Sequence, residues 1–239
     1  MRRSRFGRLA AVLLLAATAA TGLAQERRVQ NRPYIDDRLF HYGFFIGAHD
    51  QGIHFQNNGY ISPTTGEQWM VENDQMNFGF SVGVLGELRL TRWLGLRFMP
   101  SLLFNSKHLK FVNQQDGSTR SENMKSAYIG VPIHLKFAAP RFNNYRPYIV
   151  AGVAPMFDLM TGKHTMLRAK PFQASLEIGL GCDLYMRYFK FIPELKFTFG
   201  LGNVLNKKRT DLVEPADRIF TESVDHARTH MVTLTFYFE

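Results

Sequence analysis

The sequence of 239 residues contains a single cysteine, Cys182, and only two tryptophans. One thiol cannot build a disulfide framework within the chain or supply a cysteine-based zinc site. Beyond the N-terminus the sequence has no run of about 18 apolar residues, the length that a transmembrane helix requires. These shortages exclude a disulfide scaffold and a helical membrane protein.

Common catalytic motifs are also missing, because the sequence contains no GxSxG, HExxH, P-loop or paired-cysteine pattern. Histidines and serines near strand ends could serve an enzyme that acts on lipid A or phospholipid: His164, His226, His230, Ser175 and Ser223. Acidic side chains late in the chain could bind calcium, but they lack a regular ligand spacing: Asp211, Glu214, Asp217, Glu222 and Asp225. We therefore predict a protein that is not an enzyme, with no metal site and no cofactor.

The first 24 residues have the composition of a signal peptide for Sec-dependent export. Four arginines precede an apolar run from Leu9 to Ala20, and small residues stand before a predicted cleavage site after Ala24. Cleavage would lower the formal charge from +9 to +5, because four of the 29 basic residues and none of the 20 acidic ones would be removed. The mature chain therefore gives little support for a nucleic acid partner.

The rest of the chain is rich in phenylalanine (21) and glycine (19), and its apolar residues alternate with polar or small ones. Successive side chains of a β-strand point to opposite faces, so this alternation predicts strands with one apolar face. The pattern recurs in eight segments, at about residues 40–55, 76–90, 94–105, 127–137, 148–158, 172–184, 191–201 and 230–238.

The predicted strands are long enough to cross a membrane, since a tilted membrane strand needs about 9–11 residues. Long polar connections alternate with short turns; the connections are 56–75, 106–125, 159–171 and 202–228, and the turns lie near 90–93, 138–145 and 186–189. This arrangement predicts an all-β fold, an eight-stranded antiparallel transmembrane β-barrel of the outer-membrane type, with the short turns and both termini on the periplasmic side. A soluble β-sandwich or a lipocalin-like barrel would show the same period, but its apolar faces need not be free of charge over a membrane's thickness.

The polar faces of the predicted strands carry charged residues. Eight strands enclose a space just wide enough for side chains to fill, and an unpaired buried charge is costly, so we expect these residues to form an ion-pair network in the lumen. Its expected members are Glu87, Arg89, Arg97, Lys136, Glu177, Glu194 and Lys196. Aromatic residues at strand ends are expected to form a periplasmic interfacial belt: Trp93, Tyr145, Tyr148, Tyr185, Tyr188 and Phe189.

The predicted organisation has three parts: a signal peptide at 1–24, a periplasmic segment at 25–39 and the outer-membrane barrel at 40–239. The periplasmic segment has neither a strand pattern nor low complexity. We expect it either to bind a partner or to cover the mouth of the barrel. Its candidate partner-binding residues are Asn31, Pro33, Tyr34, Asp36 and Asp37.

The run VQNRPYIDDRLFHYGF at 29–44 resembles the N-terminal signature of the PorT family, outer-membrane β-barrel components of the type IX secretion system. The segments RPYIVAG at 146–152, EIGLG at 177–181 and FIPELK at 191–196 resemble outer-membrane barrels more generally. The resemblance implies a non-enzymatic protein required for export of substrates with a C-terminal sorting domain. Other type IX secretion components would be its partners. The narrow predicted lumen argues that such a protein acts through contacts and not as the conduit.

Outer-membrane lipid and lipopolysaccharide are the remaining expected partners. Basic side chains at the outer strand ends could meet lipopolysaccharide phosphates: Lys107, His108, Lys110, Arg120, Lys125, Lys163, His164, Arg168, Lys170, Lys207, Lys208 and Arg209. Two alternatives stay open, namely a lipid-modifying enzyme of the outer membrane and a small structural or diffusion barrel like OmpA or OmpX.

Overall fold

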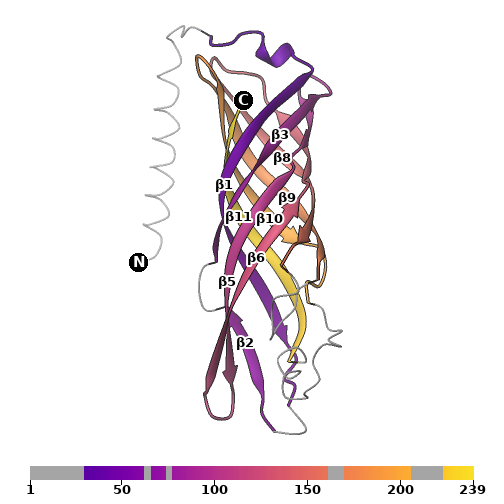
Figure 1. Cartoon of the computed structure of the whole chain (residues 1–239). Helices are drawn as coiled ribbons and strands as arrows, with labels where there is room; N and C mark the ends of the chain where they lie inside the picture. Colours follow the sequence, from indigo (N-terminus) through magenta and orange to yellow (C-terminus); the bar gives the residue numbers. More distant parts are fainter. Residues whose placement is uncertain (1–29, 62–65, 74–76, 161–169, 206–222) are drawn as a thin grey trace, which may run out of the picture.

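The computed structural model describes residues 30–61, 66–73, 77–160, 170–205 and 223–239 (Figure 1). These residues form eleven strands and one short 3-10 helix, and all the strands belong to one antiparallel sheet. No helix among them has the length and apolar character to cross a membrane. The predicted signal peptide lies outside the described residues.

The 3-10 helix, η1, covers Ile35–Asp37 and precedes the sheet. The strands are β1 Phe40–Asn57, β2 Trp69–Asn73, β3 Phe78–Arg89, β4 Leu94–Phe98, β5 Ser101–Asn113, β6 Thr119–Gly130, β7 Ile133–Ala138, β8 Tyr145–Asp158, β9 Phe172–Tyr185, β10 Lys190–Gly200 and β11 Val224–Phe238. Each of the eight predicted segments coincides with one strand or with parts of two.

The sheet closes into a ring because β1 pairs with β3 on one side and with β11 on the other. From β11 the pairing continues through β10 and β9 to β8. β3 pairs with both β4 and β5, so these two form one strand of the ring, and β8 pairs with both β6 and β7, which form another. β4 pairs with β7 and β5 with β6, and these pairs close the ring. Within the described residues the ring therefore has the eight strands that the sequence predicts, and β2 lies outside it.

Two prolines account for the divided strands. The pairing with β3 keeps one register on both sides of Pro100, which separates β4 from β5. Proline has no N–H to donate, but its carbonyl still accepts a hydrogen bond from Val84 N at 3.1 Å. Pro132 divides β6 from β7 in the same way, and its carbonyl accepts from Met99 N at 3.0 Å. The ring is thus continuous even where a donor is missing.

The two ends of the barrel differ (Figure 1). The C-terminus, η1 and the turns after β3, β7 and β9 lie at one end, which we call the turn end. At the opposite end, the loop end, β2, β5 and β6 project beyond the ring. The predicted loop 106–125 is therefore wrong in large part, because β5 and β6 continue through it to a turn at Gly117, whose φ of +70° suits glycine. Likewise, β2 lies within the predicted loop 56–75, and β11 begins six residues earlier than predicted.

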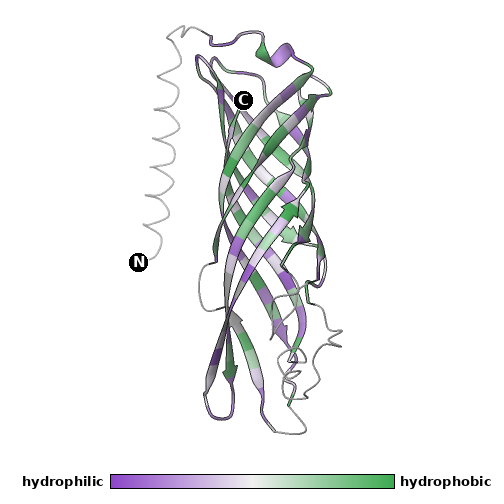
Figure 2. Cartoon of the chain, in the orientation of Figure 1, coloured by the Kyte–Doolittle hydropathy of each residue, from purple (hydrophilic) through white to green (hydrophobic). Residues whose placement is uncertain are grey.

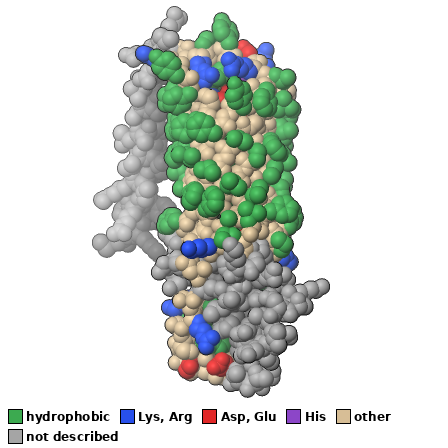
Figure 3. Space-filling view, viewed as in Figure 1, with side chains coloured by type: hydrophobic (Ala, Val, Ile, Leu, Met, Phe, Trp, Pro, Cys, Tyr) green, Lys and Arg blue, Asp and Glu red, His purple; other side chains and the backbone are tan. Residues whose placement is uncertain are grey.

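The outer wall of the ring is apolar (Figure 3), and buried polar and charged residues alternate with the apolar ones along the strands (Figure 2). Outward side chains such as Phe78 and Leu180 are 70% and 57% exposed. Soluble monomers rarely expose apolar patches larger than a few hundred Å². Here every strand of the ring carries exposed apolar side chains, and Figure 3 shows them over one face of the barrel. A closed sheet with this outer surface satisfies its backbone hydrogen bonds internally, as the hydrocarbon core of a membrane demands.

Candidate functional site

Arg97 of β4 lies at the centre of a charged network in the turn-end half of the lumen. Its side chain is fully buried, and its Nε lies 2.7 Å from the carboxylate of Glu87 on β3. Its Nη1 lies 2.7 Å from Glu194 on β10, so one guanidinium joins two carboxylates across the barrel. Tyr148 and Tyr237 flank it, with ring centroids 4.6 and 5.5 Å from its Cζ. Both hydroxyls donate to Glu194, at 2.6 and 2.8 Å.

A second cation, Lys136 of β7, extends the network toward the turn end. Its ammonium donates to both oxygens of Asp183 at 2.8 and 3.0 Å and to Glu87 at 3.3 Å. Lys190 lies 3.7 Å from Asp183 and donates to Glu239 at 2.7 Å. Each carboxylate in this layer therefore lies close to at least one cation.

Toward the loop end the network finishes at Glu177 of β9. His134 Nε2 lies 2.7 Å from its carboxylate, and Thr198 donates to it at 3.2 Å. Lys196 bridges Glu177 and Glu194 at 3.8 and 3.9 Å. All of these side chains point inward because they occupy one parity of their strands, opposite to the lipid-facing residues.

Glu239 follows β11 and is the member of the network at its turn-end side. His41 Nδ1 lies 2.6 Å from its carboxylate. Burial alone would raise the pKa of the Glu239 carboxyl, but the hydrogen bond with His41 and the nearby ammonium of Lys190 lower this pKa to about 2. Glu239 is therefore ionised at any physiological pH.

The network leaves little free space in this half of the barrel. Two cavities lie along it, one bordered by Lys136, Asp183 and Lys190 and the other by Glu177 and Lys196, and each measures about 20 Å³. Such a volume holds about one water molecule. The turn-end half of the lumen is therefore packed with side chains.

Six of the seven residues predicted for the network lie in it, and one does not. Arg89 is at the rim, where its Nη1 donates to the backbone carbonyl of Asp36 and lies 3.6 Å from the Asp37 carboxylate. β3 ends at Arg89, so its side chain emerges beyond the ring. The predicted network omitted Asp183, Lys190, Glu239, His41, His134, Tyr148 and Tyr237. The alternation places Asp183 on the polar face of β9 and His134 on that of β7, in the lumen with the chosen residues of these strands. No residue of β8 was chosen, and the signal for Tyr148 was its shared parity with Gly152 and Asp158.

Residues 30–39 fold over the mouth of the barrel at the turn end (Figure 1). Ile35 of η1 is buried, and Tyr185 donates its hydroxyl proton to Asp36 at 2.7 Å. The guanidinium of Arg141 lies on the Tyr185 ring, 3.6 Å from its centroid, and donates to the carbonyls of Asn31 and Arg32. This segment, which we call the cap, therefore has defined contacts with the barrel.

The structure divides the five candidate residues of the cap into two groups. Asn31 and Asp36 face the barrel, and Asn31 donates its backbone N–H to Asn144 Oδ1 at 2.8 Å and its side-chain amide to Tyr185 O at 2.9 Å. Pro33, Tyr34 and Asp37 are exposed, and Tyr34 is 78% accessible. The first group anchors the cap, and the second presents an outward surface.

Beside the cap lies a groove of about 670 Å³ at the rim of the barrel. Arg89, Arg92, Arg141 and Arg146 line it, together with the carboxylates of Asp36 and Asp37 and the apolar side chains of Leu39, Leu90, Trp93 and Pro140. Four guanidinium groups against two carboxylates give this groove a net positive charge.

The predicted aromatic belt is wrong for two of its six members. Tyr148 lies in the lumen and Tyr185 lies beneath the cap, both almost fully buried. Gly181 makes room for the inward Tyr148, because a Cβ at Gly181 would collide with the Tyr148 ring. Trp93, Tyr145, Tyr188 and Phe189 are exposed at the turn end.

The residues considered for lipid chemistry or ion binding lie toward the loop end or outside the described residues. Ser175 donates to the carbonyl of Ala154 at 3.1 Å, and His226 and His230 lie on β11. Of the basic loop residues, Lys110, Arg120, Lys125 and Lys170 are described at the loop end. Outside the described residues lie His164, Lys163, Arg168, Lys207, Lys208, Arg209, Asp211, Glu214, Asp217 and Glu222, and so do the side chains of Lys107 and His108. Within the described residues, no group of three or more His, Cys, Asp or Glu side chains is arranged to hold a metal ion.

Among solved structures, the chain is similar to three small outer-membrane proteins. The first is OprG from Pseudomonas aeruginosa, with 12% identity over 82% of this chain and 94% of that chain and a TM-score of 0.42. The second is Neisserial surface protein A, with 11% identity, coverage of 82% and 97% and a TM-score of 0.38. The third is Ail of Yersinia pestis, with 12% identity, coverage of 82% and 96% and a TM-score of 0.38.

No curated protein matches the sequence. A family model described as the outer membrane protein beta-barrel domain matches residues 23–206, which is more than half of the chain. Together with the closed eight-stranded ring, this match establishes that the chain belongs to the family of outer membrane beta-barrel domains.

Proposed function

We propose that this protein is a non-enzymatic outer-membrane component of type IX secretion, which supports protein export through contacts with other components and not as the conduit. The resemblance of residues 29–44 to the PorT signature supports the choice of system. The lumen supports the choice of mechanism, because a barrel packed by Arg97, Lys136 and Glu194 leaves no space for a polypeptide.

The observation that carries the proposal is the position of the PorT-like run. Residues 30–39 of this run form the cap, where Asn31 and Asp36 are held by Tyr185, Arg141 and Asn144. These contacts hold the cap so that Pro33, Tyr34 and Asp37 point away from the barrel. They lie at the turn-end mouth of the barrel, which we predict to face the periplasm. A preorganised segment of this kind loses little conformational entropy on binding a partner.

The groove beside the cap supports a proteinaceous partner. Its apolar side chains Trp93, Leu90 and Leu39 adjoin four arginines, and Trp and Arg are among the residue types enriched at binding hot spots. Its net positive charge suits an acidic segment of the partner. We therefore propose that the cap and this groove together form the docking surface.

A site-specific cross-linker tests this surface in cells. Replacing Tyr34 with p-benzoylphenylalanine should trap a type IX component, because Tyr34 is exposed on the cap. Tyr188 is 90% exposed in the turn after β9 at the same end of the barrel, and it serves as the matched control. Cross-links to a secretion component at Tyr34 and not at Tyr188 would support the proposal. Equal labelling at both positions, or none at Tyr34, would contradict it.

Secretion provides the second readout. The double substitution Tyr34→Ala and Asp37→Ala removes outward side chains without touching the anchors, so we expect normal barrel levels and reduced export of a substrate with a C-terminal sorting domain. Unchanged export would remove the cap from the mechanism.

A further inference from the structure

The backbone ladder between β9 and β10 is interrupted at the loop end of the barrel wall. The last regular bond of this pair joins Leu201 N to Ala174 O at 2.9 Å. The segments that flank β9 and β10 are joined again where Lys170 N donates to Val204 O at 2.7 Å. Between these bonds, among the described residues, no backbone hydrogen bond joins 171–173 to 202–203. The segment of wall between the two bonds, which we call the window, is therefore unpaired.

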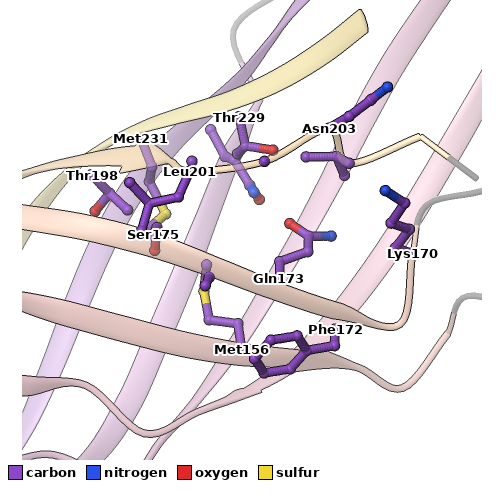
Figure 4. A pocket seen from close by; sticks show the side chains of 15 residues that line it. Met156, Lys170, Phe172, Gln173, Ser175, Thr198, Leu201, Asn203, Thr229 and Met231 are labelled. Atoms are coloured by element: carbon purple, nitrogen blue, oxygen red, sulfur yellow. The ribbon is translucent and has the colours of Figure 1, made fainter.

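Behind the window lies a cavity of about 290 Å³ (Figure 4). Phe172 and Gly202 border it at the wall, while Met156 and Met231 line its inner part. Its volume is near the lower end of the range for small-molecule sites, which is about 300–1,000 Å³. Methionine side chains are flexible and polarisable, so they adapt to the shape of an apolar ligand. The space suits a single alkyl chain and not a folded peptide.

Two buried polar groups line this cavity without a hydrogen-bond partner among the described residues. They are Nε2 of Gln173 and Oγ1 of Thr229, whose residues are 8% and 6% exposed. Leaving such a group unsatisfied costs about 1–3 kcal/mol. The Gln173 amide is a donor, so the missing partner is an acceptor such as a carboxylate or hydroxyl oxygen.

Lys170 adds a positive charge at the mouth of the cavity. It is exposed, it stands two residues before the start of β9, and it belongs to the lining (Figure 4). A cation at the mouth, an amide donor within and thioethers at the inner end match the order of groups in an amphiphile with an anionic head. The outer face of the barrel around the window is apolar and contacts lipid, so such a molecule could enter the cavity from the membrane.

We infer that this cavity binds a single-chain alkyl carboxylate, with its head between Lys170 and Gln173 and its chain against Met156 and Met231. The cavity is not needed to close the lumen, because the charged network fills the opposite half of the barrel. It does not rest on the proposed role in secretion, and the cap has no part in it.

Binding is tested with sodium dodecanoate on the full mature chain in lipid nanodiscs. The readout is the ¹³C-methyl NMR signals of Met156 and Met231, each assigned from a Met→Leu variant. We expect both signals to shift saturably in the unsubstituted protein. No saturable shift there would overturn the inference, as would shifts confined to methionines elsewhere in the chain.

A blocked window gives the matched comparison. A Cβ added at Gly202 would have no heavy atom within 4 Å, and Gly202 has no positive φ, so Gly202→Trp places an indole in the window without backbone strain. Ala151→Trp adds the same indole to an exposed position of the wall on β8. We expect binding to survive in Ala151→Trp and to be lost in Gly202→Trp. Equal binding by the two variants would contradict the assignment, and Gly202→Leu repeats the test if the indole prevents insertion.

The head group is tested by exchanging charge on either partner. Lys170→Gln should weaken dodecanoate binding by about fivefold, the upper limit for an exposed ion pair. The same substitution should leave binding of uncharged dodecanol unchanged. Equal affinity of the unsubstituted protein for dodecanoate and dodecanol would show that the carboxylate assignment is wrong.

Discussion

The two halves of the lumen are built on the same eight strands, and they differ in the charge of the side chains that enter them and in the free space that these side chains leave. In the turn-end half, Arg97, Lys136 and Lys196 join carboxylates from several strands, and the cavities measure about 20 Å³. In the loop-end half, Gln173 and Thr229 border a cavity of about 290 Å³ without partners among the described residues. Strand parity therefore decides which side chains enter the lumen, and the chemical type of these side chains decides whether they fill it.

The physical cost of each arrangement differs as well. Buried charges are stable only when paired, and removing one partner of such a pair destabilises a protein by about 3–5 kcal/mol. A buried neutral group without a hydrogen-bond partner costs about 1–3 kcal/mol of stability. A molecule bound in the cavity can supply that partner and so remove the cost. The comparison therefore predicts opposite responses to substitution in the two halves.

The largest effect is expected for Arg97→Met. The substitution leaves Glu87 and Glu194 without their closest cation, so the free energy of unfolding should fall by about 3–5 kcal/mol. Urea unfolding from lipid vesicles measures it, and Arg92→Met at the exposed rim is the control. If both variants lost the same stability, the network would not hold the turn-end half together.

A smaller loss is expected for Tyr237→Phe. It removes one hydrogen bond to the Glu194 carboxylate, made at 2.8 Å, while the ring beside Arg97 stays in place. Hydrogen bonds to charged groups contribute about 1.5–3 kcal/mol, and the same unfolding measurement should show a loss in this range. No loss would mean that Arg97, Tyr148 and Lys196 satisfy Glu194 without the Tyr237 hydroxyl.

The sharpest contrast between the halves comes from one substitution made at two threonines. Thr198→Val removes a hydrogen bond of 3.2 Å to the Glu177 carboxylate and should destabilise the barrel by about 1.5 kcal/mol, the lower end of the range for a charged acceptor. Thr229→Val replaces an unpartnered hydroxyl with a methyl group of similar size and should stabilise it by about 1 kcal/mol. Changes of the same sign at both positions would contradict the difference between the two halves.

The last effect depends on pH and concerns acid at the turn-end rim. The pKa of Glu239 is about 2 in the folded protein and 4.5 ordinarily, so its ionised form contributes stability that is present above pH 4.5 and lost as the pH falls toward 2. Glu239→Gln should therefore make the stability less dependent on pH between 4.5 and 2. A titration of unfolding midpoints in that window measures the slope, and identical slopes in the two proteins would contradict the assignment.

Much of the fold could be predicted because each strand of a membrane barrel has one lipid-facing and one lumen-facing side, and this produces an alternating pattern in the sequence. Alternation located eight strands, and the short turns fixed which ends meet. The extension of β5 and β6 beyond the ring escaped prediction, since outside the membrane no apolar face has to alternate. The division at Pro100 and Pro132 escaped it too, because a missing donor interrupts a strand without changing its register.

The site could be predicted in part for a similar reason. Parity placed Arg97, Lys136 and Glu194 in the lumen, but parity does not say where a strand leaves the ring, and so Arg89 was misplaced. Tyr148 was assigned to the interfacial belt because aromatic residues at strand ends usually lie there, although Gly181 opposite it leaves room inside. The cap contacts join residues such as Asn31 and Asn144 that are far apart in the sequence, and no local pattern reports such pairs.

Conductance in planar bilayers measures whether the charged network closes the turn-end half of the lumen. The purified full-length mature protein should insert without forming stable open channels, since the free space along the network holds about one water molecule at each of its two cavities. Stable, long-lived open channels formed by the unsubstituted barrel would contradict the account.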